Sequence, residues 1–178
     1  MRSQDFVRDL TAARIGATCN FYREGAGAEI RRGRLVDYLD ARRHARVLLV
    51  GEAAGYRGAR VSGIPFTSER QLTGEPPGEA SATIVHRVLA ELGLTEDVLL
   101  WNVVPTHPHR PGDEGSNRAP TALEVAAGAG FLPALARDRT VLAVGRVAHR
   151  LLGGPYVRHP SHGGMAQFRE ALLIYACP

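Results

Sequence analysis

Two short stretches, far apart in the chain, join an apolar run to residues that can do chemistry. The first covers residues 50–58, Val-Gly-Glu-Ala-Ala-Gly-Tyr-Arg-Gly, and completes the apolar run 46–50. The second, Arg-His-Pro-Ser-His-Gly-Gly at 158–164, follows the short run 156–157. Runs this short are typical of buried strands, and ligands of open α/β sheets bind just outside the carboxyl ends of the strands. The two stretches therefore predict a ligand crevice at one edge of a parallel sheet.

Three side chains of suitable chemistry are expected at this edge. Asn102 interrupts the apolar run 98–104 near its carboxyl end. A buried amide needs hydrogen-bond partners; these can be neighbouring backbone groups or the edge of a nucleobase, which a planar carboxamide can read. His159 precedes Pro160 and is therefore held in an extended conformation. Glu52 directly follows the first run, so a carboxylate, an amide and an imidazole should meet there.

One aromatic side chain stands in the long connection 52–78, which is rich in glycine and proline. Phe66 lies in its segment 63–67, Gly-Ile-Pro-Phe-Thr. Connections of this length in compact domains are usually functional. Phe66 either anchors the loop or offers a surface on which a flat ring can stack.

The elements that must position these residues alternate between strands and helices. We expect strands at 46–50, 98–104, 141–144 and 155–158. Apolar periodicity predicts helices at 3–15, 30–43, 79–92, 122–136, 146–152 and 164–174. A second long connection covers 105–120. The alternation predicts an α/β fold, a three-layer α/β/α sandwich with a short, mainly four-stranded parallel sheet, forming a single domain over residues 1–178.

The charge and cysteine content narrow the chemistry. All 22 cationic residues are arginine, and the net charge is +4. This suits an anionic partner without establishing one; the arginine groups at 31–34 and 42–46 are either solvated helix faces or phosphate contacts. The absence of lysine excludes a side-chain Schiff base. Two cysteines cannot supply the four thiolates that an iron–sulfur cluster normally uses.

No apolar run approaches the length of a membrane span, and residues 1–5 show no signal-peptide pattern. We therefore expect a cytoplasmic protein with no membrane partner.

Taken together, these stretches resemble the uracil-DNA glycosylase superfamily. The matches run from about residue 46 to 170, in the family order. Residues 51–55, Gly-Glu-Ala-Ala-Gly, resemble its first motif, closest to the GEAPG form of its bacterial iron–sulfur branch. Residues 63–66 resemble the segment whose phenylalanine stacks on the flipped base. Residues 101–104 resemble the strand that carries the uracil-reading asparagine of the superfamily. Residues 117–121 are similar to the Asn-Arg-Thr-Pro-Thr run that follows this strand, and residues 159–161 look like the second motif.

The resemblance implies a monomeric, nucleoid-associated DNA repair glycosylase that needs no metal or redox cofactor. It would flip uracil or another deaminated base out of DNA, hydrolyse the N-glycosidic bond and leave an abasic site. The implied catalytic residues are His159 and Glu52. The implied base-binding residues are Gly51, Ala53, Gly55, Tyr56, Phe66 and Asn102. The implied DNA contacts are Arg57, Arg118, Ser161, His162 and Gly163.

Some positions depart from the family pattern. The iron–sulfur cysteines are absent, which places the chain nearest a cluster-less bacterial group. Ala53 stands where the best-known branch has its water-activating aspartate. Gly55 stands where that branch has a tyrosine that crowds the 5-position of the base, so we expect room for larger bases such as hypoxanthine or xanthine.

Three other interpretations stay open. The first is a protein that binds damaged or abasic DNA with little turnover, which the alanine at 53 favours. The second is a metal site built from histidines, although ligand spacing with a carboxylate or cysteine partner is not evident. The candidates for it are His107, His109, His159 and His162. The third is a generic nucleotide-binding domain, although residues 51–58 lack the Lys-Ser/Thr of a P-loop.

Overall fold

A four-stranded parallel sheet forms the centre of the protein, in the order β2-β1-β3-β4. The computed structural model describes residues 1–161 and 163–176; His162, one of the expected DNA contacts, lies outside the described residues. The strands are β1 (Val47–Ala53), β2 (Val98–Val104), β3 (Thr140–Val144) and β4 (Tyr156–Val157). Gly51 pairs with Asn102, and Val144 with Val157, so the expected chemistry lies at one edge of the sheet.

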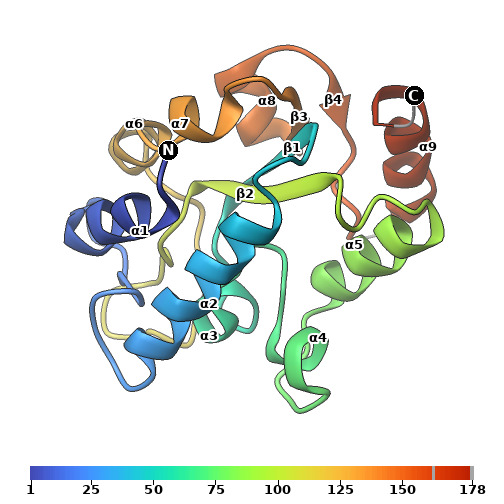
Figure 1. Ribbon diagram of the computed structural model, residues 1–178. Helices are drawn as coiled ribbons and strands as arrows, with labels where there is room; N and C mark the ends of the chain where they lie inside the picture. The colour runs from blue at the N-terminus through green and yellow to red at the C-terminus, as the bar shows by residue number, and fades with distance from the viewer. Residues whose placement is uncertain (162, 177–178) are drawn as a thin grey trace.

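Helices cover both faces of the sheet, which confirms the three-layer prediction (Figure 1). Alternate residues of each strand point to opposite faces: Leu48 and Val50 pack against α1, α2, α6, α7 and α8, while Val47 and Leu49 pack against α5 and α9. Both faces are therefore buried, which explains the nearly continuous apolar strand sequences. The helices are α1 (Ser3–Ala12), α2 (Ala28–Ala41), α3 (Ala59–Ser62), α4 (Glu69–Thr73), α5 (Ala80–Glu91), α6 (Ala122–Ala129), α7 (Leu132–Ala136), α8 (Arg146–Leu152) and α9 (Met165–Tyr175).

Several element boundaries differ from those expected. The helix expected at 122–136 is interrupted: α6 ends at Ala129 with Gly130 as its C-cap, and α7 begins anew with Pro133 in its first turn. The missing N–H of proline costs nothing at that position. The first helix ends at Ala12, because the Asn20 side chain donates to backbone carbonyls at the end of this helix. Strand β1 continues to Ala53, so the first motif begins within the strand.

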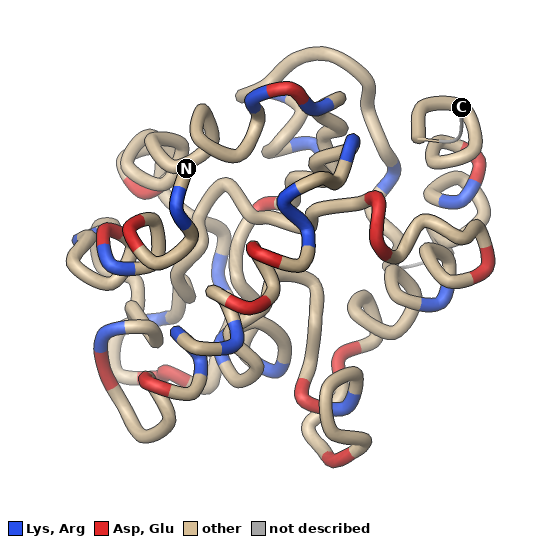
Figure 2. The backbone as a smooth tube through the Cα atoms, in the orientation of Figure 1, with Lys and Arg blue, Asp and Glu red and all other residues tan. Residues whose placement is uncertain are grey.

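Several arginines have a structural role that neither interpretation of the sequence included. Basic and acidic positions are interspersed along the chain (Figure 2). Arg31 donates to three backbone carbonyls at 2.6–3.2 Å, and Arg139 to four at 2.7–3.3 Å. Arg34 makes a two-pronged ion pair with Glu69, both distances 2.8 Å, that joins α2 to α4. These arginines hold loops and helices together rather than forming a solvated face.

Across the described ranges, no helix combines the length and the apolar character needed to cross a membrane.

Candidate active site

A cavity of about 230 Å³ opens at the carboxyl edge of the sheet and brings the expected residues together. Segments from widely separated parts of the chain reach it: the end of β1 and the turn that leads into α3, the loop with Phe66, the start of α5, strand β2, the second long loop and the segment after β4. The lining residues are Glu52, Ala53, Gly55, Ala59, Phe66, Glu79, Ser81, Asn102, Asn117 and His159. Six of these were expected from the sequence in catalytic or base-binding roles: Glu52, Ala53, Gly55, Phe66, Asn102 and His159.

Asn102 brings a buried amide to the cavity. The residue is 4% exposed, and its side chain has no hydrogen-bond partner among residues 1–161 and 163–176. Buried amides in proteins are almost always paired with protein groups or with ordered water. The alternative in which neighbouring backbone groups satisfy this amide is therefore wrong. An unpaired amide facing a cavity indicates a polar ligand.

Phe66 adopts a backbone conformation that a phenylalanine rarely takes, with φ of +52°. Such strain in a non-glycine residue persists only where the surroundings impose it, often at functional sites. The ring lies over Gly51: a Cβ there would come within 2.7 Å of Phe66 Cε2 and 2.8 Å of Asn102 Oδ1. The glycine therefore allows the aromatic ring and the amide to meet at the end of β1.

Buried hydrogen bonds fix the turn that presents Phe66. Ser62 Oγ donates to Thr67 O at 2.7 Å and accepts from Ile64 N at 3.0 Å. Thr67 Oγ1 donates to Pro65 O at 3.1 Å. From the N-terminal part of the chain, the fully buried Tyr22 hydroxyl donates to the Gly63 carbonyl at 2.8 Å. These contacts provide the external support that the strained backbone of Phe66 requires.

The geometry of His159 assigns its tautomer. Ser161 N donates to His159 Nδ1 at 3.2 Å, and Ser161 Oγ lies 2.7 Å from the same nitrogen. Because Nδ1 accepts a backbone N–H, the neutral ring carries its proton on Nε2. His159 therefore carries its N–H on Nε2, and Ser161, two positions further along the chain, holds the ring through Nδ1.

Glu52 is half-buried at the end of β1, beside the Asn102 strand. Burial raises the pKa of its carboxyl, and Arg150 partly offsets this effect. The carboxylate lines both this cavity and an adjoining cleft of about 410 Å³ that also contains Arg118, Arg158 and His159. A carboxylate in this position can orient a water molecule or face a developing positive charge.

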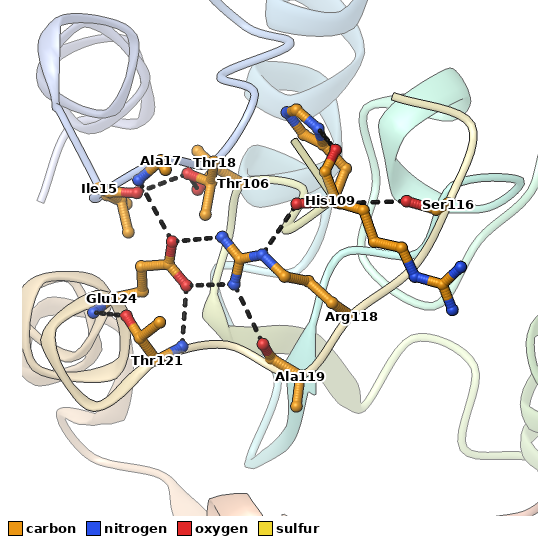
Figure 3. Close-up of polar contacts among 11 residues, drawn as sticks. Ile15, Ala17, Thr18, Thr106, His109, Ser116, Arg118, Ala119, Thr121 and Glu124 are labelled. Carbon is orange, nitrogen blue, oxygen red and sulfur yellow. Dashed lines mark hydrogen bonds and ion pairs between the residues drawn. The ribbon is translucent and has the colours of Figure 1, made fainter. Parts of the chain in front are cut away.

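The Arg118 guanidinium makes hydrogen bonds to other residues of the protein (Figure 3). Its guanidinium makes two bonds to Glu124, at 2.6 and 2.7 Å, and donates to His109 O at 2.8 Å and to Ala119 O at 3.0 Å. The Glu124 carboxylate also accepts from Thr121 N at 2.8 Å, completing a capping box at the start of α6. The expected contact between Arg118 and DNA stays a prediction, since most of its donors already have acceptors within the protein.

The network around Arg118 supports its neighbour Asn117, which reaches the cavity. Asn117 Oδ1 accepts from Tyr56 N at 3.0 Å and so ties the second long loop to the turn after β1. Tyr56, expected to bind the base, lies instead along a neighbouring groove with Arg57. Its ring contacts the Arg60 guanidinium, 4.9 Å from the ring centre.

Two further expected DNA contacts lie after β4. Ser161 contacts His159, and Gly163 has a φ of +76°, which suits glycine.

Four cavity residues were not among the expected site residues: Ala59, Glu79, Ser81 and Asn117. Glu79 is the one with an ionisable side chain. Its carboxyl fills the space beside Gly55, where a Cβ would collide with Glu79 Oε1. The room that we expected at Gly55 is therefore occupied, and that prediction is wrong. The sequence held one local sign that Glu79 is unusual. Glu79 stands at the N-cap position of α5, directly after the proline-rich loop, and glutamate is a poor N-cap residue.

A larger cleft, about 790 Å³, lies at the opposite edge of the sheet and includes Arg46 and Arg139. Arg46 pairs with Asp97, and Arg139 binds backbone carbonyls. In the part of the chain that the structure describes, no group of three or more His, Cys, Asp or Glu side chains is placed to hold a metal ion. The histidine metal site therefore has no support among the described residues.

Comparison with known proteins identifies the family to which this fold belongs. The chain belongs to the uracil DNA glycosylase superfamily, whose family model matches residues 37–177. Among solved structures, it is similar to wild-type SMUG2 of Pedobacter heparinus, with a TM-score of 0.65 and 15% sequence identity, over 98% of this chain and 95% of that one. At this identity the likeness concerns the fold. No curated protein matches the chain significantly.

Proposed function

We propose that this protein excises uracil from DNA by hydrolysing the bond between the base and the sugar. Members of its superfamily are DNA glycosylases. The observation that carries the proposal is the pairing, in one cavity, of the unpaired Asn102 amide with a histidine that presents an Nε2 proton. These two groups are complementary to the polar edges of a uracil ring.

The target base must leave the stack before it can reach the cavity, at a cost of a few kcal/mol. Phe66 then stacks on one face of the ring, and Asn102 reads the edge that carries N3 and O4. His159 donates from Nε2 to O2. As the glycosidic bond breaks, negative charge grows on the base, and the His159 donor stabilises it where it develops.

The sugar becomes positively charged as the base departs, as in other glycoside cleavages. Glu52 is the carboxylate at hand to offset this charge and to orient the attacking water. Around the flipped nucleotide, we propose that Arg57, Arg118, Ser161, His162 and Gly163 contact the DNA strand. Tyr56 and Arg57 extend this surface along the groove beside α5.

Single-turnover cleavage of a uracil-containing oligonucleotide, with enzyme in excess and EDTA present, tests the proposal. We expect excision by the native protein, and a loss of roughly a hundredfold or more in the chemical step for His159→Ala and for Asn102→Ala, as for lost oxyanion donors. His44→Ala, at an exposed histidine on the far side of β1, is the matched control. Rates near native in both site variants would show that the pocket is misplaced.

A second candidate function is binding of damaged or abasic DNA with little turnover. Ala53 favours it, because a methyl group lines the cavity where the best-known branch has an aspartate. The same single-turnover experiment separates the two functions. Intact substrate after prolonged incubation, together with tight binding of the oligonucleotide, would favour the binding protein.

A further inference from the structure

The carboxyl of Glu79 sits in a space made by two glycines. A Cβ at Gly55 would collide with Glu79 Oε1, and a Cβ at Gly58 would collide with Glu79 Oε2. The side chain thus lies across the turn that follows β1, with backbone behind it. Both oxygens approach positions that any other residue type at 55 or 58 would fill.

Local structure does not account for this placement. Glu79 stands at the N-cap position of α5, but its side chain does not cap the helix. The carboxyl makes no hydrogen bond or ion pair with any residue in the described ranges, and burial raises its pKa. A half-buried acid without a partner costs stability. Residues that break local rules in this way are expected at functional sites.

The proposed binding mode leaves one edge of the base for Glu79, and the inference rests on that proposed function. In a pyrimidine held as above, His159 faces O2, Asn102 faces N3 and O4, and N1 carries the sugar. The remaining edge is the one that carries C5. Gly55 and Glu79 both line the cavity, and the Glu79 carboxyl lies against Gly55. We place these two residues at the C5 edge.

We infer that Glu79 is the residue that determines base selectivity at the C5 edge, admitting uracil and rejecting thymine. A 5-methyl group would need the space that the carboxyl occupies. The carboxyl cannot retreat toward the turn, because the backbone at Gly55 and Gly58 already lies against its oxygens. The methyl would also be buried against a polar group and remove water from it, which is unfavourable. The same wall limits entry of larger rings such as hypoxanthine.

Two substitutions separate the size of the side chain from its charge. Glu79→Ala removes the wall, and Glu79→Gln keeps its volume. The measured quantity is the ratio of thymine to uracil excision, from single-turnover rates on oligonucleotides that carry one target base. A methyl group in a pocket changes discrimination by about 10–200-fold. We expect the ratio to rise by at least about tenfold in Glu79→Ala and to stay near the native ratio in Glu79→Gln.

Glu75→Ala is the matched control, since Glu75 is an exposed acid of the same loop that does not line the cavity; its ratio should equal the native one. A second measurement, binding of free uracil and free thymine followed by NMR titration, needs no turnover. The native protein should prefer uracil, and Glu79→Ala should lose most of that preference.

These measurements distinguish the failure of the selectivity role from the failure of the proposed function. If the native protein excises no uracil, the proposed function fails, and the free-base preference decides the role of Glu79. An unchanged thymine-to-uracil ratio in Glu79→Ala, or an unchanged free-base preference where no base is excised, would overturn the inference. A Glu79→Gln ratio as high as that of Glu79→Ala would equally overturn it, because volume would then not be the cause.

Discussion

Replacing Glu124 by glutamine should lower the free energy of unfolding by about 3 kcal/mol at pH 7. The carboxylate is 2% exposed and pairs with Arg118 through two bonds. Arg118 is the main cause that lowers the pKa of Glu124 from an ordinary 4.5 to about 2, with further help from the backbone N–H groups of Thr121 and Ala17. Since a tenfold change in an equilibrium constant corresponds to about 1.4 kcal/mol, this shift amounts to roughly 3 kcal/mol.

The pH dependence follows from the direction of that shift. The folded-state pKa of Glu124 lies below its unfolded-state value, so the contribution is complete above about pH 4.5. It is lost as the pH falls from about 4.5 toward 2, because protons then bind the unfolded chain first. The difference in stability between the native protein and Glu124→Gln should therefore shrink over this range.

Urea unfolding followed by the fluorescence of Trp101, the single tryptophan and a fully buried one, measures this difference. Arg118→Ala should cost about 3–5 kcal/mol, since it leaves a buried carboxylate unpaired. The double variant should lose less than the sum of the two single variants. The exposed pair Arg87–Glu91 is the control, and breaking it should cost about 0.5 kcal/mol or less. A cost below about 1 kcal/mol for Glu124→Gln, or one that stays constant down to pH 2, would refute the reasoning.

Two further predictions concern the site. Gly51→Ala should slow uracil excision by roughly tenfold or more, because its Cβ would displace both Phe66 and Asn102. Gly33→Ala is the control, since there is open space around its Cβ, and it should leave single-turnover rates unchanged. Equal rates in the two variants would contradict the close packing at the end of β1. The product of excision should be an intact abasic strand, because the chain has no lysine to form a Schiff base with the sugar; borohydride trapping of a protein–DNA adduct would contradict this.

Much of the fold could be predicted from the sequence because its signals are local. The four apolar runs are too short for helices and too apolar for loops, and all four are strands of one parallel sheet. The break between α6 and α7 was missed because the apolar periodicity continues across Gly130. The local signal for the break was Pro133, which favours the first turn of a new helix. The close packing of α6 on β2 is a tertiary feature, since a Cβ at Gly128 would collide with the Val103 carbonyl.

The candidate site was predicted in part. Asn102 and His159 were identifiable because each breaks a local pattern at a strand end, and parallel strands bring such ends to one edge. Arg118 was expected to contact phosphate because its charge is visible in the sequence, and that contact stays a prediction; its pairing within the protein was not expected. Its partner Glu124 is visible too, as the third helical residue of a capping box, but the two-pronged pairing depends on how the loop folds back over α6.

The sequence by itself determined the order of strands and helices, the edge at which the chemistry lies and the residue types available there. These follow from the periodicity of side chains along an element, which is a property of neighbouring residues. Only the tertiary structure decided that the space beside Gly55 belongs to Glu79. A glycine shows that a Cβ is absent, but which atoms enter the resulting space depends on segments that meet only when the loop before α5 folds back onto the turn after β1.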